Sequence, residues 1–332
     1  MHNSSLPPLL VVTFAVDAPG RAVVADALGG VAAVVYLPDL DAAARAQALT
    51  SAAALLTGNI GRELRADERP LIAHVRLVQF MSAGVDHIAF ADLPAGTPMA
   101  ANRGAYAAPI AEHVAAMALA AAKRLLVEHR NLGRGEFNQF VETRRLAGAV
   151  CGIFGFGGIG VAVARLMRCL GMRIHAINRR GATSEPVEWI GSPADLLQLL
   201  EASDVVVIAV PLTASTERAI GAAELRAMKP DAVLVNVARG EILDEDALWA
   251  HLRANPRFTA CLDAWWVEPV RHGEFRVDHP FVELPNVIGS PHNSGSSAGA
   301  REEALRFAVA NCRRALTGRA PTHLIAPEER LR

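Results

Sequence analysis

The stretch AVCGIFGFGGIG, residues 149–160, decides the fold of this chain. It opens with an apolar run typical of a buried strand. Gly155, Gly157 and Gly160 then follow with the spacing GxGxxG at the opening of a helix. The first glycine of such a motif permits a tight turn, the second lets the backbone approach a pyrophosphate, and the third lets the helix pack on the strand. The helix N-terminus adds unpaired N–H groups and a positive dipole that attract phosphate.

Alone, this motif could be a flexible turn, but the strand before it and the helix after it favour a dinucleotide-binding loop. The residues expected to contact the cofactor here are Gly155, Phe156, Gly157, Gly158, Ile159 and Gly160.

The end of the next predicted strand, in IHAINRRGA (residues 174–182), bears on the choice of cofactor. Asn178 lies twenty residues after Gly158, where an NAD-binding fold usually places an Asp or Glu that binds the ribose 2′-OH. A neutral amide tolerates a 2′-phosphate, and an arginine can bind one through paired charge-assisted hydrogen bonds. Asn178, Arg179 and Arg180 therefore favour NADP, with NAD as the alternative. The competing interpretation is that both arginines are solvated loop charges and that Asn178 simply binds the ribose.

Short β-type runs alternate with helical stretches along most of the chain, which predicts an α/β fold with parallel sheets in two Rossmann-like units. The strands expected in the first unit are residues 9–16, 32–37, 53–58, 77–81 and 98–102. Those expected in the second unit are residues 149–156, 173–178, 204–211, 232–238, 258–264 and 286–292. Residues 109–130 predict one long buried helix, residues 131–145 a polar arm, and residues 298–318 an amphipathic helix.

Length and composition agree with a two-domain globular protein. The chain has 332 residues, of which 52% are hydrophobic and 20% charged, and its net charge of −1 argues against disorder and against a polyanion-binding surface. Its four cysteines form no CxxC pair, which predicts free thiols in the cytoplasm. The N-terminal segment lacks a basic leader. The uncharged run 146–164 contains six glycines and therefore predicts a strand, a turn and a helix instead of a membrane span.

Three residues at the carboxyl ends of predicted strands are candidates for catalysis. Arg239, Glu268 and His292 follow three different strands, and ligands of open α/β sheets bind at this edge. Arg239 could bind the carboxylate of a 2-oxo acid, and His292 could protonate its carbonyl oxygen as hydride reaches the carbon. Glu268 would orient His292 and favour its charged form. Taken singly, each residue could equally be a surface charge, a solvated loop acid or a turn residue.

The chain resembles the D-isomer-specific 2-hydroxyacid dehydrogenases over nearly its whole length. The resemblance is carried, in order, by FMSAGVDHI, NRGAYAAPIAEHVAAMALAAAKR, LAGAVCGIFGFGGIG, VPLTASTERAIGAAELRAMKPDAVLVNVARGEILDEDAL, LDAWWVEP and LPNVIGSPHNSG. It implies that Arg239, Glu268 and His292 are catalytic. The further cofactor contacts it implies are Val210, Pro211, Val237, Ala238, Arg239, Asp263, His292 and Ser294. The substrate contacts it implies are Ala83, Gly84 and Val85 together with Arg239 and His292.

The resemblance also implies a domain division and an assembly. Residues 1–104 and 296–332 would form a discontinuous, flavodoxin-like substrate domain, and residues 105–295 the dinucleotide-binding domain. The active site would lie in the cleft between them, and the helix from Pro109 with the arm after it would form a homodimer. The chain departs from the family pattern at Asn293, at the bulky pair Trp265 and Trp266, and in the longer stretch around residues 270–278.

These observations predict an oxidoreductase that transfers hydride between NADP(H) and a small 2-oxo or 2-hydroxy acid, with glyoxylate or hydroxypyruvate favoured. One alternative is an NAD-dependent dehydrogenase of another 2-hydroxy acid. Another is a non-catalytic dinucleotide sensor like the C-terminal binding protein corepressors, which resemble the same family. No nucleic acid, membrane or metal partner is expected.

Overall fold

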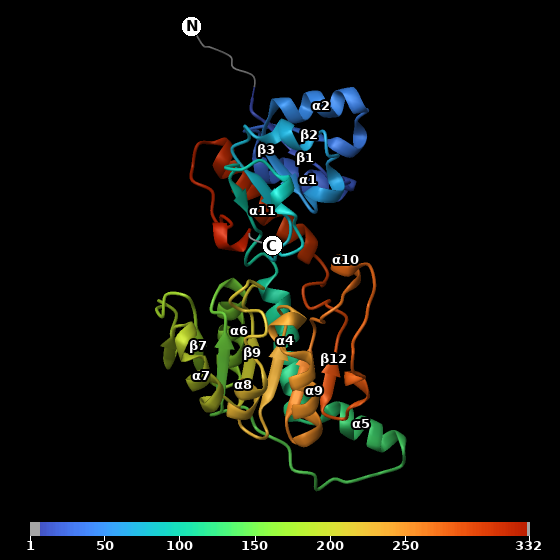
Figure 1. The fold of residues 1–332 in the computed structure, drawn as a ribbon, viewed down its shortest axis with the longest axis vertical. Coiled ribbons are helices and arrows are strands. Elements are labelled where there is room, and N and C mark those ends of the chain that lie inside the picture. The colour runs from blue at the N-terminus through green and yellow to red at the C-terminus, as the bar shows by residue number, and fades with distance from the viewer. Residues whose placement is uncertain (1–6, 331–332) are drawn as a thin grey trace. The chain divides into compact units, whose positions relative to one another are not determined.

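The computed structural model describes residues 7–330, and the chain divides into two compact units (Figure 1). One unit comprises the chain up to Tyr106 together with the chain from Ala298 onward. The other is the continuous stretch Ala107–Ser297. The first unit is therefore built from both ends of the sequence.

The first unit contains a five-stranded parallel sheet in the order β2-β1-β3-β4-β5. Its strands are β1 (Leu9–Val12), β2 (Ala33–Tyr36), β3 (Ala52–Thr57), β4 (Val78–Phe80) and β5 (Met99–Ala100). Its α-helices are α1 (Ala18–Leu28), α2 (Ala42–Ser51), α3 (Ile60–Glu63) and α11 (Ala300–Leu316).

Helices α1 and α11 pack together over one face of this sheet. Val24 of α1 and Leu305 and Val309 of α11 share a buried cluster with Leu10 and Val12 of β1. Helix α2 contributes Leu49 to a second cluster. Because successive strand residues point to opposite faces, the apolar runs predicted as strands supply both clusters.

The second unit contains a seven-stranded parallel sheet in the order β12-β11-β10-β9-β6-β7-β8. Its strands are β6 (Val150–Phe154), β7 (Arg173–Ile177), β8 (Trp189–Gly191), β9 (Val205–Ile208), β10 (Val233–Asn236), β11 (Thr259–Leu262) and β12 (Val287–Gly289). Its α-helices are α4 (Ala107–Ala122), α5 (Leu125–Gly133), α6 (Gly158–Cys169), α7 (Leu196–Ala202), α8 (Ala222–Ala227), α9 (Glu245–Ala254) and α10 (Pro269–His272).

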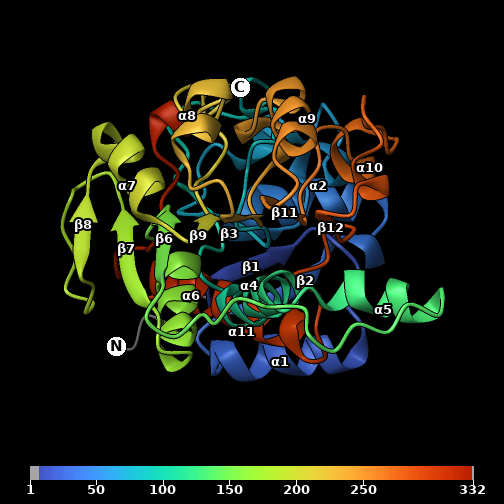
Figure 2. The same cartoon turned by 90° about the horizontal axis from the view of Figure 1, so that it is seen from below.

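Helices cover both faces of the seven-stranded sheet. Helices α4 and α6 lie on one face and α7, α8 and α9 on the other (Figure 2). The residues of the central strands β6, β9 and β10 are all buried, as expected for a parallel sheet covered on both faces. Strand order reverses between β6 and β9, so this is the switch point where such sheets bind ligands.

The predicted α/β class with two parallel sheets is confirmed, and two details differ from the prediction. The sequence pattern missed β8, a three-residue edge strand. The single long helix predicted over residues 109–130 is wrong, because Arg124 takes a left-handed conformation (φ 53°) that separates α4 from α5. Helix α4 is largely buried, whereas α5 has no buried residue. No helix within residues 7–330 is long and apolar enough to cross a membrane.

Candidate active site

The glycine loop after β6 has the geometry that the sequence predicts. Gly155 has φ 110°, and a Cβ there would lie 2.5 Å from the carbonyl carbon of Ala209. A Cβ on Gly160 would lie 2.3 Å from the carbonyl oxygen of Gly155, so only glycine lets α6 pack this closely on the loop. A Cβ on Gly157, in contrast, would meet no atom within 4 Å. The loop is therefore open at its second glycine, and its residues fit the pyrophosphate of a dinucleotide at the N-terminus of α6.

The loop after β7 holds Asn178, Arg179 and Arg180. The Asn178 side chain shapes this loop, since its Nδ2 donates to the carbonyl of Ala182 (2.9 Å) and its Oδ1 accepts from the backbone N–H of Arg180 (2.9 Å). Gly181 then turns with φ 60°. Arg179 and Arg180 are exposed at the tip of the loop. The two guanidinium groups therefore lie at the end of β7, the strand that pairs with β6.

Arg239 lies in the loop after β10, and a buried asparagine fixes that loop. Asn236 is fully buried; its Nδ2 donates to the carbonyl of Arg239 (2.8 Å), and its Oδ1 accepts from the N–H of Ala238 (3.0 Å). The Arg239 guanidinium donates through Nη1 to the carbonyl of Ala238 (2.7 Å). Asn236 was not among the residues predicted from the sequence. A lone amide inside an otherwise apolar strand could have pointed to it.

Glu268 and His292 form the pair that the sequence predicted. The His292 Nδ1 atom lies 2.8 Å from both Glu268 carboxylate oxygens, and the Trp265 backbone N–H donates to Glu268 Oε1 (2.8 Å). His292 itself has φ 51°, an uncommon conformation for a residue with a Cβ. Because the carboxylate engages Nδ1, the ring presents Nε2 for proton exchange.

Glu268 is kept ionised although only 6% of its surface is exposed. Burial, the largest single influence, would raise the pKa of its carboxyl group, but the hydrogen bond and charge of His292 lower it, and the pKa lies below its ordinary value. The Trp265 N–H and the Arg239 charge lower the pKa of Glu268 further. Arg239, Glu268 and His292 are therefore electrostatically connected at one edge of the sheet.

Asp263, at the end of β11, holds the segment that carries His292. It is fully buried and accepts hydrogen bonds from the backbone N–H groups of Asn293 and Ser294 (both 3.1 Å) and from the Ser290 hydroxyl (2.5 Å). Burial would raise the pKa of Asp263, but the hydrogen bonds from Ser290 and Ser294 lower it below its ordinary value. His113 of α4 lies 3.0 Å from the Ser290 hydroxyl. Sequence analysis did not single out His113 or Ser290.

The other predicted residues fall at three places. Val210 and Pro211 follow β9, the strand beside the glycine loop. Val237 and Ala238 are buried after β10. Ala83, Gly84 and Val85 belong to the first unit, in the loop after β4. Asn102 anchors the start of that loop, since its Nδ2 donates to the Met81 carbonyl and its N–H to the Ser82 carbonyl.

Residues 115–294 match the family described as D-isomer specific 2-hydroxyacid dehydrogenase, NAD binding domain. The chain belongs to this family. The predicted oxidoreductase class is thereby confirmed at the level of the family, and the matched residues lie in the second unit, which contains the family's NAD-binding domain.

Curated relatives of this chain carry related names. A glyoxylate reductase from Thermococcus gammatolerans is 39% identical over 181 residues; this match covers 54% of the chain and spans only about half, 52%, of that relative. A glyoxylate reductase from Thermofilum pendens is 30% identical over 289 residues, covering 82% of this chain and 80% of its own.

Among solved structures, the D-isomer specific 2-hydroxyacid dehydrogenase from Xanthobacter autotrophicus Py2, in complex with NADPH and MES, has a TM-score of 0.78. It is 25% identical and covers 97% of this chain and 99% of its own.

The two tryptophans that depart from the family pattern have separate contacts in this chain. The Trp265 indole N–H donates to the carbonyl of Ser290, and the Trp266 indole N–H donates to the carbonyl of Leu243 (both 2.8 Å). Phe275, from the longer stretch 270–278, packs edge-on against Trp265 (ring centroids 5.7 Å apart). Both indoles are at least nine-tenths buried. They therefore act as packing and hydrogen-bonding groups.

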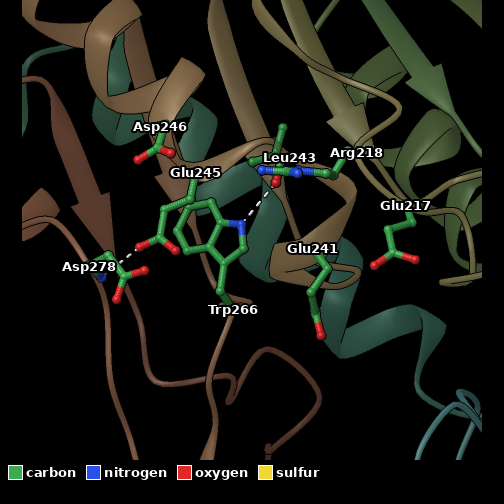
Figure 3. Close-up of a pocket in the computed structure, with 8 residues that line it drawn as sticks. All are labelled: Glu217, Arg218, Glu241, Leu243, Glu245, Asp246, Trp266 and Asp278. Atoms are coloured by element: carbon green, nitrogen blue, oxygen red, sulfur yellow. Dashed lines mark hydrogen bonds between the residues drawn. The ribbon is translucent and has the colours of Figure 1, made fainter.

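The second unit has a surface pocket of about 230 Å³, whose lining residues are drawn in Figure 3. Its lining residues are Glu217, Arg218, Glu241, Leu243, Glu245, Asp246, Trp266 and Asp278. None of them is a predicted site residue. Five of the eight are carboxylates, which would repel an anionic 2-oxo acid. The pocket is therefore not a candidate for the substrate site.

Proposed function

We propose that this protein is an NADP-preferring reductase of a small 2-oxo acid, with glyoxylate or hydroxypyruvate as its substrate. The observation that carries the proposal is the His292–Glu268 pair, which lies at the same sheet edge as Arg239 and the open glycine loop. An acid or base, a cation for the substrate carboxylate and a dinucleotide loop together fit reduction of a 2-oxo acid.

When bound, the nicotinamide supplies or accepts the hydride. Arg239 binds the substrate carboxylate and polarises the carbonyl. His292 gives the proton at Nε2 to the carbonyl oxygen in reduction and removes it from the hydroxyl in oxidation. Glu268 holds Nδ1, fixes the orientation of the ring and stabilises its positive charge.

The cofactor preference rests on the loop after β7. It carries two exposed arginines and lacks a carboxylate at position 178, while the Asn178 amide holds the loop in shape. A 2′-phosphate gains charge-assisted hydrogen bonds from a guanidinium, whereas a carboxylate would repel it. Val210, Pro211, Val237, Ala238, Asp263 and Ser294 would complete the cofactor site, as the family resemblance implies.

The substrate assignment is supported by the two relatives named glyoxylate reductase. Ala83, Gly84 and Val85 would hold the substrate carboxylate through their backbone N–H groups. Within residues 7–330 these three N–H groups donate to no protein acceptor. Residues 1–104 and 296–332 would then form the substrate domain and residues 105–295 the dinucleotide domain.

Two further expectations complete the proposal. The protein would be a homodimer, since α5 and the arm after it expose Leu132, Phe137 and Phe140. It would work in the cytoplasm, in keeping with its four cysteines, which are all free thiols.

A steady-state comparison tests this function. Purified protein is assayed with NADPH and with NADH on glyoxylate, hydroxypyruvate, pyruvate and phenylpyruvate. We expect kcat/KM to be highest with NADPH and one of the first two acids. Turnover confined to NADH, or to the larger acids, would contradict the cofactor or the substrate assignment. Tight dinucleotide binding without turnover of any acid would favour a non-catalytic sensor.

The arginine loop needs its own control. Arg179→Ala should lower the ratio of kcat/KM for NADPH to that for NADH, whereas Arg168→Ala, on helix α6 outside the loop, should leave the ratio unchanged. An unchanged ratio in both variants would show that the loop arginines are only surface charge.

A further inference from the structure

Ser290 lies two residues before His292, and each of its polar groups has a partner. Its N–H donates to the Leu262 carbonyl (2.9 Å), and its own carbonyl accepts from the Trp265 indole N–H (2.8 Å). Its hydroxyl lies 2.5 Å from Asp263 Oδ1 and 3.0 Å from His113 Nε2. The residue is therefore fixed on every side.

The direction of the hydrogen bonds through this hydroxyl follows from its single proton. The 2.5 Å contact with an ionised, buried carboxylate takes that proton, because a hydroxyl donates most strongly to an anion. The Ser290 oxygen then has only acceptor capacity for His113, so His113 Nε2 is the donor. The two hydrogen bonds therefore run in one direction: His113 donates to Ser290, and Ser290 donates to Asp263.

Asp263 connects this chain of hydrogen bonds to the loop that carries His292. It accepts the N–H groups of Asn293 and Ser294, the two residues directly after His292. Between Ser290 and these two N–H groups the backbone must hold His292 at φ 51°. A residue with a Cβ keeps such a conformation only where its surroundings impose it. The hydrogen bonds on both sides of His292 impose it here.

His113 approaches from an element far away in sequence. It is the seventh residue of α4, which begins at Ala107, where the chain enters the second unit. The loop that carries His292 ends at Ser297, where the chain leaves that unit. The His113–Ser290 bond joins these two segments within the second unit, so α4 helps to determine the position of the catalytic loop.

We propose that His113 is a positioning residue for the reaction: by donating to Ser290 it fixes the loop that holds His292 against Glu268. The inference rests on the proposed function. It assigns His113 no contact with substrate or cofactor. Its effect should therefore be larger on kcat than on the dissociation constant of the dinucleotide.

Three variants test this role. His113→Leu removes the donor at similar volume, and His113→Gln keeps an N–H near the position of Nε2. Glu112→Gln changes the exposed neighbour on the same helix. We expect His113→Leu to lower kcat by about tenfold or more, since small misplacements of catalytic groups are costly. His113→Gln should recover most of that loss, and Glu112→Gln should match the wild type. The dissociation constant for NADPH, from fluorescence titration, should change less than kcat in His113→Leu and should match the wild type in Glu112→Gln.

Amide hydrogen exchange of the peptide that contains Asn293 and Ser294 provides a readout independent of activity. His113→Leu should speed exchange there, His113→Gln should restore protection, and the glycine-loop peptide should be unaffected. If no 2-oxo acid is turned over by the wild type, the proposed function fails, and this exchange pattern still decides the positioning role. The role is overturned if His113→Leu retains wild-type kcat and exchange. It is also overturned if His113→Gln loses as much as His113→Leu, since the imidazole would then serve only packing.

Discussion

A carboxylate with almost no exposed surface stays ionised at Glu268 because donors and positive charges lie around it. The Trp265 N–H and the His292 ring contact it directly, and the Arg239 charge acts on it from the loop after β10. Removing one member of such a buried group leaves the remaining buried charges without a partner. The free energy of unfolding then falls by more than the mutual attraction of the group contributes.

The lowered pKa of Glu268 predicts an acid-sensitive contribution to stability. Because the folded-state pKa lies below the ordinary value of 4.5, the contribution is fully present above that pH and is lost as the pH falls through the lower folded value. Urea unfolding of the wild type and Glu268→Gln at pH 7, 5, 4 and 3 measures it. The wild type should lose stability relative to the variant only at the acidic end. A difference between the two proteins that is constant with pH would contradict the lowered pKa.

Replacing the catalytic candidates separates their roles. His292→Ala should lower kcat by roughly 10²- to 10⁴-fold, since general acid catalysis contributes about that much. Arg239→Lys keeps a positive charge but loses the paired donors, so KM for the 2-oxo acid should rise. Steady-state kinetics on the best substrate checks both. Wild-type rates in either variant would remove that residue from the mechanism.

Among single residues, the sequence predicted candidate site residues only where a charged or titratable side chain comes at or soon after the end of a predicted strand. Arg239, Glu268 and His292 could be singled out because each is a charged or titratable side chain at the end of a predicted strand or within a few residues of it. His113 could not, because a histidine in an apolar helix gives no sign of its partner 177 residues away. Asn178 was expected at the ribose, and its loop-shaping hydrogen bonds depend on a turn that the sequence pattern does not specify.

Among the elements, the strand–loop–helix unit from β6 to α6 shows why three glycines recur at one spacing. A Cβ added at Gly155 or at Gly160 would lie within 2.6 Å of backbone atoms, whereas the space beside Gly157 is open. Gly155 and Gly160 are therefore needed for packing, and Gly157 leaves space for a ligand to approach the backbone.

This difference predicts opposite phenotypes for two alanine variants. Gly157→Ala should fold with nearly wild-type stability but bind NADPH about tenfold more weakly or worse, because the methyl group occupies the side where the pyrophosphate approaches. Gly160→Ala should lose about 1–3 kcal/mol of stability, because helix and loop must move apart. Thermal unfolding and fluorescence titration check the pair. Equal effects of both variants on both properties would refute the division of roles.

The ends of strands and helices could be predicted where the residues are continuously buried, and less well at the edges of the sheets. The core strands of both sheets lie within the predicted runs, except that β3 begins one residue earlier, at Ala52, since a parallel strand covered on both faces must be apolar throughout. Strand β8 has only three residues and one neighbour, β7, so it leaves too short a pattern. The break at Arg124 left no sequence signal either, because a positive φ at an arginine is not encoded by residue type.

For the whole molecule, assembly is the property that the exposed arm predicts. Phe140 is 83% exposed and Phe137 78% exposed, which is unusual for aromatic side chains. If the arm forms the homodimer, Phe140→Ser should shift the protein toward monomer, whereas Leu197→Ser, at an exposed site on α7, should not. Sedimentation velocity at several concentrations measures the shift. A wild type that is monomeric throughout would refute the dimer.

The first unit combines the start of the chain with its last long helix, and this arrangement has a consequence for synthesis. Val12 and Leu56 of the five-stranded sheet are buried in one cluster with Ala308 and Val309 of α11. The ribosome makes about two hundred residues, the whole second unit included, between β5 and that helix. The part of this sheet face that α11 covers, beside α1, therefore stays exposed until after the second unit has been synthesised. A nascent chain stalled before residue 300 should bind chaperones through the first unit, and release of α11 should end that binding.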